Sequence, residues 1–112
     1  MATLYRIILT KEPTLADFLP DNVRGRPKPA DPDLERYWYG FSAYATETQA
    51  RKKARGVPTL GTAIAALDLP EDDSRISFER SLSSKGHHTI WGDAAILLGR
   101  VQSVVSVEPD LE

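Results

Sequence analysis

The chain has 112 residues, with 14 basic and 16 acidic side chains and no cysteine. This length predicts one domain that can hold a core on its own, and the lack of thiols excludes disulfides and cysteine-based metal sites. The uncharged stretch at residues 57–67 contains proline and glycine and is too short to cross a bilayer, which excludes a membrane span. The first residues lack a signal-peptide pattern, so we expect a cytoplasmic protein.

The first forty residues combine two predicted strands with helical turns and a long loop. Residues 3–9 are rich in bulky and β-branched side chains, which favours a strand. Residues 14–19 lie between two prolines and predict one or two helical turns. Residues 21–33 are rich in proline and basic side chains and predict an irregular loop, whose length favours a functional role. The alternating aromatic side chains of residues 36–41 predict a second strand.

The remainder of the chain begins with a predicted helix at residues 46–55. Thr46 and Gln49 fit a capping box at its start, and Gly56 ends it. Asp93 can cap a shorter helix at residues 94–98. Further strands are predicted at residues 62–69, 75–80, 87–91 and 100–107.

These elements predict the α+β class: a single domain over residues 1–110 with a mainly antiparallel mixed sheet of about six strands and two or three helices. Most connections between the predicted strands are too short for right-handed crossovers, which favours antiparallel pairing. We interpret Leu111 and Glu112 as the remnant of an expression tag and leave them out of the fold.

A dense aromatic segment is followed at once by a basic helix. Five aromatic residues lie between residues 37 and 44, and the predicted helix after them carries Arg51, Lys52, Lys53 and Arg55. Flat rings beside fixed cations suit a base and its phosphates, and the free amides at the helix start suit an anion. The alternative is that the rings pack in the core and the charges lie in solvent.

Two later segments carry further candidate groups. Glu79 ends a predicted strand, where a carboxylate facing a cleft can stabilise a developing cation or accept a proton; the alternative is a solvated charge beside Arg80. His87 and His88 are neighbours in a strand and point to opposite faces, so they cannot share a metal ion, and no third ligand is spaced to help. We therefore expect no metal site, with one histidine in a cleft and the other packed. The serines lack a nucleophile elbow, and no dinucleotide-binding glycine motif, Walker A loop or helix-turn-helix pattern is present.

The order of these features resembles the small bacterial ADP-ribosyltransferase-like domains of uncharacterised function. The strand around Arg6 resembles the opening of that fold, and the segment from Tyr39 to Tyr44, which contains Ser42, resembles its serine-containing motif. The resemblance implies NAD as the cofactor, Arg6 as its anchor, Ser42 beside the nicotinamide and Glu79 as the catalytic carboxylate. We add Tyr44 and His87 as candidate cofactor-binding residues.

The sequence departs from that family's pattern at two places. Ala43 follows Ser42 where the family often has threonine or serine, and no Glu-x-Glu or Gln-x-Glu pair occurs around Glu79. The sequence therefore leaves open whether the chain is an enzyme.

Three hypotheses follow for the function. In the first, the chain binds NAD or another nucleotide in an ADP-ribosyltransferase-like cleft, which requires Arg6 and Glu79 to lie on the same side of the sheet. In the second, it is a non-catalytic, antitoxin-like protein-interaction module that uses the loop at residues 21–33 and the aromatic segment. In the third, the basic residues bind RNA or a single strand, which the acidic stretches at residues 68–73 and 108–110 disfavour.

Overall fold

The computed structural model describes residues 2–80 and 86–108, so the expected tag remnant at Leu111 and Glu112 lies outside the described residues. Six strands form one sheet in the order β4-β5-β2-β1-β3-β6. Every neighbouring pair is antiparallel, which confirms the predicted α+β class. The strands are β1 (Ala2–Ile8), β2 (Phe41–Tyr44), β3 (Ala63–Leu69), β4 (Ile76–Arg80), β5 (His87–Gly92) and β6 (Val101–Ser106).

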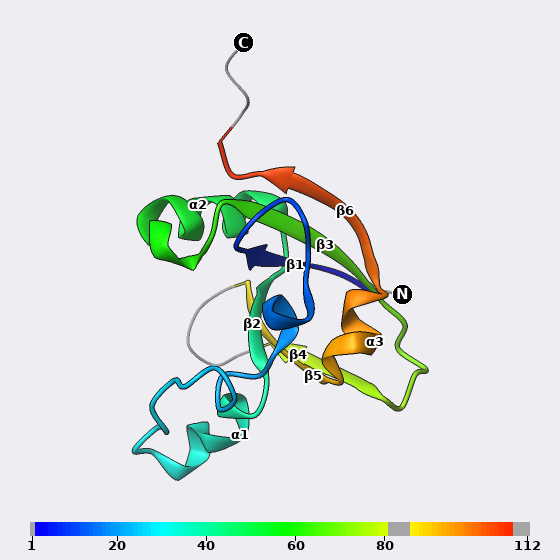
Figure 1. Cartoon of the computed structure of the whole chain (residues 1–112). Helices are drawn as coiled ribbons and strands as arrows, with labels where there is room; N and C mark the ends of the chain where they lie inside the picture. The colour runs from blue at the N-terminus through cyan, green and yellow to red at the C-terminus, as the bar shows by residue number, and fades with distance from the viewer. Residues whose placement is uncertain (1, 81–85, 109–112) are drawn as a thin grey trace.

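Helices cover the two faces of this sheet. The α-helices are α1 (Glu35–Trp38), α2 (Glu47–Gly56) and α3 (Ala94–Leu98), and the short 3-10 turns are η1 (Leu15–Phe18), η2 (Pro32–Leu34) and η3 (Pro58–Leu60). In Figure 1, η1 and α3 lie next to each other near the centre and right of the view, whereas α2 lies at the upper left. None of these helices is long and apolar enough to cross a membrane.

Strand alternation divides the core between the two faces. On one face, Leu4 and Ile8 of β1 pack with Phe18 of η1 and Leu97 of α3. On the other face, Ile7 of β1 packs with Ala50 and Ala54 of α2, together with side chains of β3. The two alanines are fully or almost fully buried, and their small size lets α2 lie close to the sheet.

The predicted helix starts agree with the structure in most details. The Thr46 hydroxyl accepts a hydrogen bond from the Gln49 amide at 3.1 Å, although the Gln49 side chain does not complete the capping box and its Oε1 has no partner among the described residues. Asp93 Oδ1 accepts hydrogen bonds from the amides of Ala95 at 2.9 Å and Ile96 at 3.4 Å. Both caps act as expected on the free amides of a first turn.

The strand predicted at residues 36–41 is wrong. Residues 35–38 form α1, and only Phe41 belongs to a strand, as the first residue of β2. Asp31 Oδ1 accepts a hydrogen bond from the Asp33 amide at 2.9 Å and Pro32 opens η2, so a helical turn is already under way when the aromatic segment begins. The rings at alternate positions imitate the period of a strand, but the local cap decides the conformation.

Two glycines provide a matched test of the backbone. Gly61 has φ of 152°, and a β-carbon there would overlap the Ile8 carbonyl, whereas a β-carbon on Gly56 would meet nothing within 4 Å. We expect Gly61→Ala to lower the free energy of unfolding by about 1–3 kcal/mol, because both the strain and the backbone clash must be relieved. Gly56→Ala should be neutral or stabilising by up to about 1 kcal/mol. Urea unfolding of the two variants checks this, and equal stabilities would contradict it.

Candidate functional site

A cleft of about 750 Å³ lies on the α2 side of the sheet. Its floor comes from β1, β2 and β5, and its walls from α2 with the following turn and from the segment at residues 20–38. These two walls lie at the upper left and lower left of Figure 1. The lower wall is thin, because residues 21–39 include no buried residue.

The floor of the cleft contains the buried side chain of Arg6, which is 7% exposed. Its Nε donates to the Asp17 carbonyl at 3.1 Å and its Nη1 to the Ser42 carbonyl at 2.8 Å. The guanidinium also lies 4.7 Å from the centre of the Phe41 ring. A guanidinium has five donor hydrogens, so these two hydrogen bonds leave donors for a ligand.

Burial changes the acidity of Arg6. Desolvation by burial, followed by the nearby Arg24, lowers the pKa of its guanidinium to about 10, while Asp21 and Asp17 act in the opposite direction. The group therefore stays protonated at neutral pH, although the protein holds its charge at a cost. A buried cation that donates hydrogen bonds to neutral carbonyl groups is suited to an anionic ligand.

Arg6 reaches the cleft through an opening in the sheet. By alternation, its side chain leaves β1 on the face of Leu4 and Ile8, which is opposite the α2 side. The register of β1 with β2 contains a single residue pair, Tyr5 with Tyr44. Next to this pair, the Ser42 carbonyl accepts a hydrogen bond from the Arg6 guanidinium instead of from a backbone amide of β1. At this point the guanidinium lines the cleft.

Four more floor residues come from one antiparallel pair. The register places Ser42 opposite Thr89 and Tyr44 opposite His87, so all four side chains share the α2 side of the sheet. The rings of Tyr44 and His87 are 5.4 Å apart and nearly perpendicular. The predicted cofactor-binding residues Arg6, Ser42, Tyr44 and His87 thus all line one cleft.

His87 has an unusual environment for a histidine. Desolvation lowers its pKa, as do the nearby His88 and Lys53, while Asp21 raises it. Its Nδ1 is buried and has no hydrogen-bond partner among the described residues. His88 instead lies on the other face, where its Nδ1 is 3.1 Å from the Gly86 carbonyl. The structure therefore places one histidine, His87, at the cleft, as expected, whereas His88 is half-buried on the other face.

The walls of the cleft combine cationic and aromatic side chains with prolines and aliphatic residues. Asp21 is the one carboxylate among the described lining residues, and burial raises its pKa. Three cations line the two walls, and three aromatic rings line the cleft, each in contact with another ring of the protein. These residues are Arg24, Arg26 and Lys53, and Tyr37, Trp38 and Tyr44.

Glu79, the predicted catalytic carboxylate, does not line the cleft. It lies in register with Thr89 and so shares the α2 side of the sheet, where it contacts Tyr37, a residue of the cleft wall. The Tyr37 hydroxyl donates to Glu79 Oε1 at 3.3 Å, and Arg36 forms an ion pair with the same oxygen. The side chains of Arg6 and Glu79 leave the sheet on opposite faces, so the condition set by the first hypothesis is not met. Only the guanidinium tip of Arg6 reaches the cleft, and Glu79 lies outside it.

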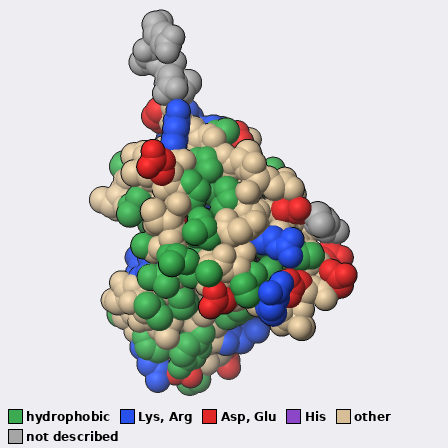
Figure 2. Space-filling model, turned by 45° about the vertical axis from the view of Figure 1, so that its right-hand side comes forward, with side chains coloured by type: hydrophobic (Ala, Val, Ile, Leu, Met, Phe, Trp, Pro, Cys, Tyr) green, Lys and Arg blue, Asp and Glu red, His purple; other side chains and the backbone are tan. Residues whose placement is uncertain are grey.

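The basic residues proposed for RNA binding are divided among different partners. Lys28 pairs with Glu35, Arg51 with Glu47 and Arg55 with Glu108, which leaves only part of the set at the cleft. Figure 2 shows the α3 side of the molecule, where charges of both signs are scattered among apolar side chains and no continuous basic surface is visible in the atoms drawn. A single extended basic face is therefore not formed on that side.

Sequence reasoning included Tyr37 and Lys53 in the aromatic segment and basic helix that suit a nucleotide, but it did not assign Asp21, Arg24 and Arg26 to that site. Their signal was present in the unusual length and basic character of the loop at residues 21–33 and in the basic helix. Nothing in the sequence indicates that these two segments form the two walls of one cleft. Among the described residues, no group of acidic, histidine or cysteine side chains could hold a metal ion.

Comparisons with protein-family models, with curated protein sequences and with solved structures gave no match.

Replacing Arg6 tests its structural role. Arg6→Met removes the donors to the carbonyls of Asp17 and Ser42, and we expect the free energy of unfolding to fall by about 2 kcal/mol. Arg24→Met is the matched control, because among the described residues the Arg24 side chain makes only a 4.0 Å ion pair with Asp21, and its effect should stay within about 0.5 kcal/mol. Urea unfolding measures both, and a fully stable Arg6→Met variant would show that the sheet does not need this link.

His87 predicts a pH dependence of stability. Because its pKa is lower in the folded state than the ordinary value of 6.5, the unfolded chain binds a proton more readily, and stability should decrease as pH falls through this value. Asp21, Lys53, His88 and Tyr44 are the neighbouring polar groups. Unfolding measured from about pH 8 to pH 5.5 should show a smaller decrease for His87→Gln than for the parent chain. His88→Gln should keep the decrease, and the reverse pattern would contradict the assignment.

Proposed function

We propose that this chain binds NAD or another nucleotide in the cleft above Arg6. The observation that carries the proposal is the buried Arg6 guanidinium, held on the cleft floor by two carbonyl groups with donors to spare. The cleft volume of about 750 Å³ falls within the usual range for sites that bury a small ligand. The resemblance to ADP-ribosyltransferase-like domains favours NAD within this ligand class.

The chemistry of the walls suits both parts of a nucleotide. A nucleotide combines a flat base, which stacks on aromatic rings, with phosphate oxygens, which accept hydrogen bonds from cations. Tyr37, Trp38 and Tyr44 provide rings in the same cleft that contains Arg6 and further cations. Ser42 and His87 add a hydroxyl and an imidazole as polar partners on the floor.

Catalysis is a separate part of the proposal. Glu79 would act on NAD only after its contacts with Arg36 and Tyr37 open, because those contacts occupy its carboxylate and separate it from the cleft. The geometry therefore supports binding more directly than transfer of ADP-ribose. If the chain releases nicotinamide from NAD, the release should be lost in Glu79→Gln while NAD binding persists.

A protein-interaction module is the second candidate. Val23, Leu34 and Tyr39 are exposed by 61%, 40% and 51%, and all three belong to the segment that forms the lower wall. Exposed apolar side chains gathered on one segment are a feature of contact surfaces. Substitution of Val23 and Tyr39 by serine would weaken the binding of a protein partner without changing nucleotide binding, since neither residue lines the cleft.

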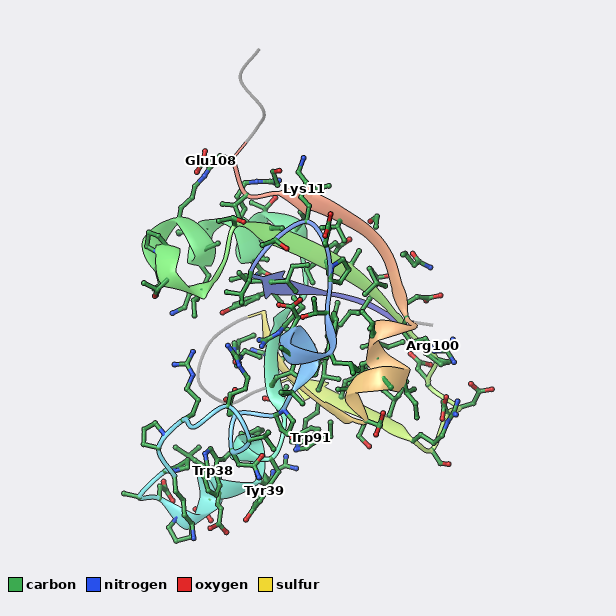
Figure 3. The ribbon with its side chains drawn as sticks, viewed as in Figure 1. Lys11, Trp38, Tyr39, Trp91, Arg100 and Glu108 are labelled. Carbon is green, nitrogen blue, oxygen red and sulfur yellow. The ribbon has the colours of Figure 1, made fainter. Side chains whose placement is uncertain are left out.

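An NMR titration with NAD tests the proposed binding. We expect amide shifts at Ser42, Tyr44 and His87 and no shift along β6, whose residues lie outside the cleft. Arg6→Lys keeps a charge but loses the planar fork, and we expect about tenfold weaker binding. Arg100→Lys is the control, because Arg100 lies far from the cleft, at the right of Figure 3. This variant should bind NAD with the same affinity as the parent chain. The absence of shifts at millimolar NAD would overturn the proposal.

A further inference from the structure

The cations of this chain differ in their partners according to position. Away from the cleft, six of the described cations pair with a carboxylate: Lys28, Arg36, Arg51, Arg55, Arg75 and Arg100. The exposed Lys52 and Arg80 also lie outside the cleft and have no ion pair among the described residues. At the cleft, neither Arg26 nor Lys53 has a carboxylate within ion-pair distance among the described residues, and Arg24 has only Asp21 at 4.0 Å. Positive charge without internal partners is therefore concentrated where a ligand could neutralise it.

The lower wall holds its two arginines on a fixed turn. The amides of Arg24 and Arg26 donate to the carbonyls of Pro20 and Asp21 at 3.1 Å and 3.0 Å. Gly25 between them has φ of 83°, a conformation that other residues rarely adopt. Trp38 Nε1 donates to the Arg26 carbonyl at 2.7 Å, and Figure 3 shows Trp38 beside this wall.

The upper wall is fixed by other contacts of α2. Arg51 Nε and Nη2 donate to the carbonyls of Val107 at 2.9 Å and Ser106 at 3.1 Å, and Arg55 forms an ion pair with Glu108 at 2.9 Å. These contacts occupy two of the basic side chains of α2 and fasten the helix to the end of β6. Lys53, on the same helix, instead lines the cleft.

From this arrangement we infer that the cleft binds a ligand with two linked phosphates, which Arg24 and Arg26 contact from one wall and Lys53 from the other. A single phosphate carries its oxygens around one centre, whereas the cations come from two separate segments that line the cleft. A diphosphate presents oxygens on both sides and can neutralise the cations of both walls. The inference rests on the proposed nucleotide binding and narrows it to nucleoside diphosphates and dinucleotides.

Affinities for a graded series of ligands test this inference. We expect calorimetry to rank ADP and NAD above AMP by at least about tenfold, with adenosine weakest and inorganic pyrophosphate binding detectably. Lys53→Gln and Arg26→Gln should each lower the affinity for ADP about tenfold and reduce the salt dependence of ADP binding. The affinity for adenosine should stay unchanged. Lys52→Gln is the matched control, because Lys52 is the exposed neighbour of Lys53 on α2 and does not line the cleft.

The outcomes separate this inference from the proposed function. If ADP, AMP and adenosine bind equally well and Lys53→Gln has no effect, the diphosphate subsite is wrong while nucleotide binding stands. If adenosine, AMP, ADP and NAD all fail to bind to the folded chain, both are wrong. Arg26→Lys keeps the charge and should retain most of the ADP affinity, and an equal loss in Arg26→Lys and Arg26→Gln would contradict an electrostatic contact.

Discussion

The structure around the cleft depends on one buried guanidinium. Arg6 joins β1, the turn of η1 and β2, because its hydrogen bonds end on the carbonyl groups of Asp17 and Ser42. Asp17 is itself fixed, since its side chain accepts hydrogen bonds from the amides of Thr14 at 2.8 Å and Leu9 at 3.3 Å. A charged side chain thus provides the connection that backbone pairing provides between β1 and β3. The same guanidinium that joins these elements also lines the cleft, where its remaining donors can contact the proposed ligand.

This use of Arg6 explains why a cleft forms beside the middle of the sheet. β1 pairs with β3 over seven residue pairs but with β2 at one, so the sheet is continuous on one side of β1 and open on the other. The opening exposes the floor residues of β2 and β5, whose register then brings Ser42, Tyr44, His87 and Thr89 together. The burial of Arg6, the opening and the polar floor are therefore consequences of one arrangement.

Patterns of hydrophobicity and local caps predicted most of the fold, because the strands alternate regularly and the Thr46 and Asp93 caps act within one helical turn. The strand predicted for the aromatic segment was wrong, because a helical turn that starts at Asp31 and Pro32 precedes this segment and overrides its strand-like period. Of the predicted site residues, Arg6, Ser42, Tyr44 and His87 share a cleft, but the separation of Glu79 from it depends on Tyr37 and Arg36, which form a wall only after folding. Sequence order could not show that Asp21 would be the carboxylate in the cleft.

The thin lower wall has a consequence for how the molecule moves. Because residues 21–39 include no buried residue, the hydrophobic effect does little to hold this wall, and its attachment depends on polar contacts such as those of Arg36 with Trp91 and Glu79. Local opening of this segment therefore needs much less free energy than unfolding of the sheet, and its amide hydrogens exchange with solvent long before those of β1 and β3. Small molecules can enter and leave the cleft through such openings while the six strands stay paired.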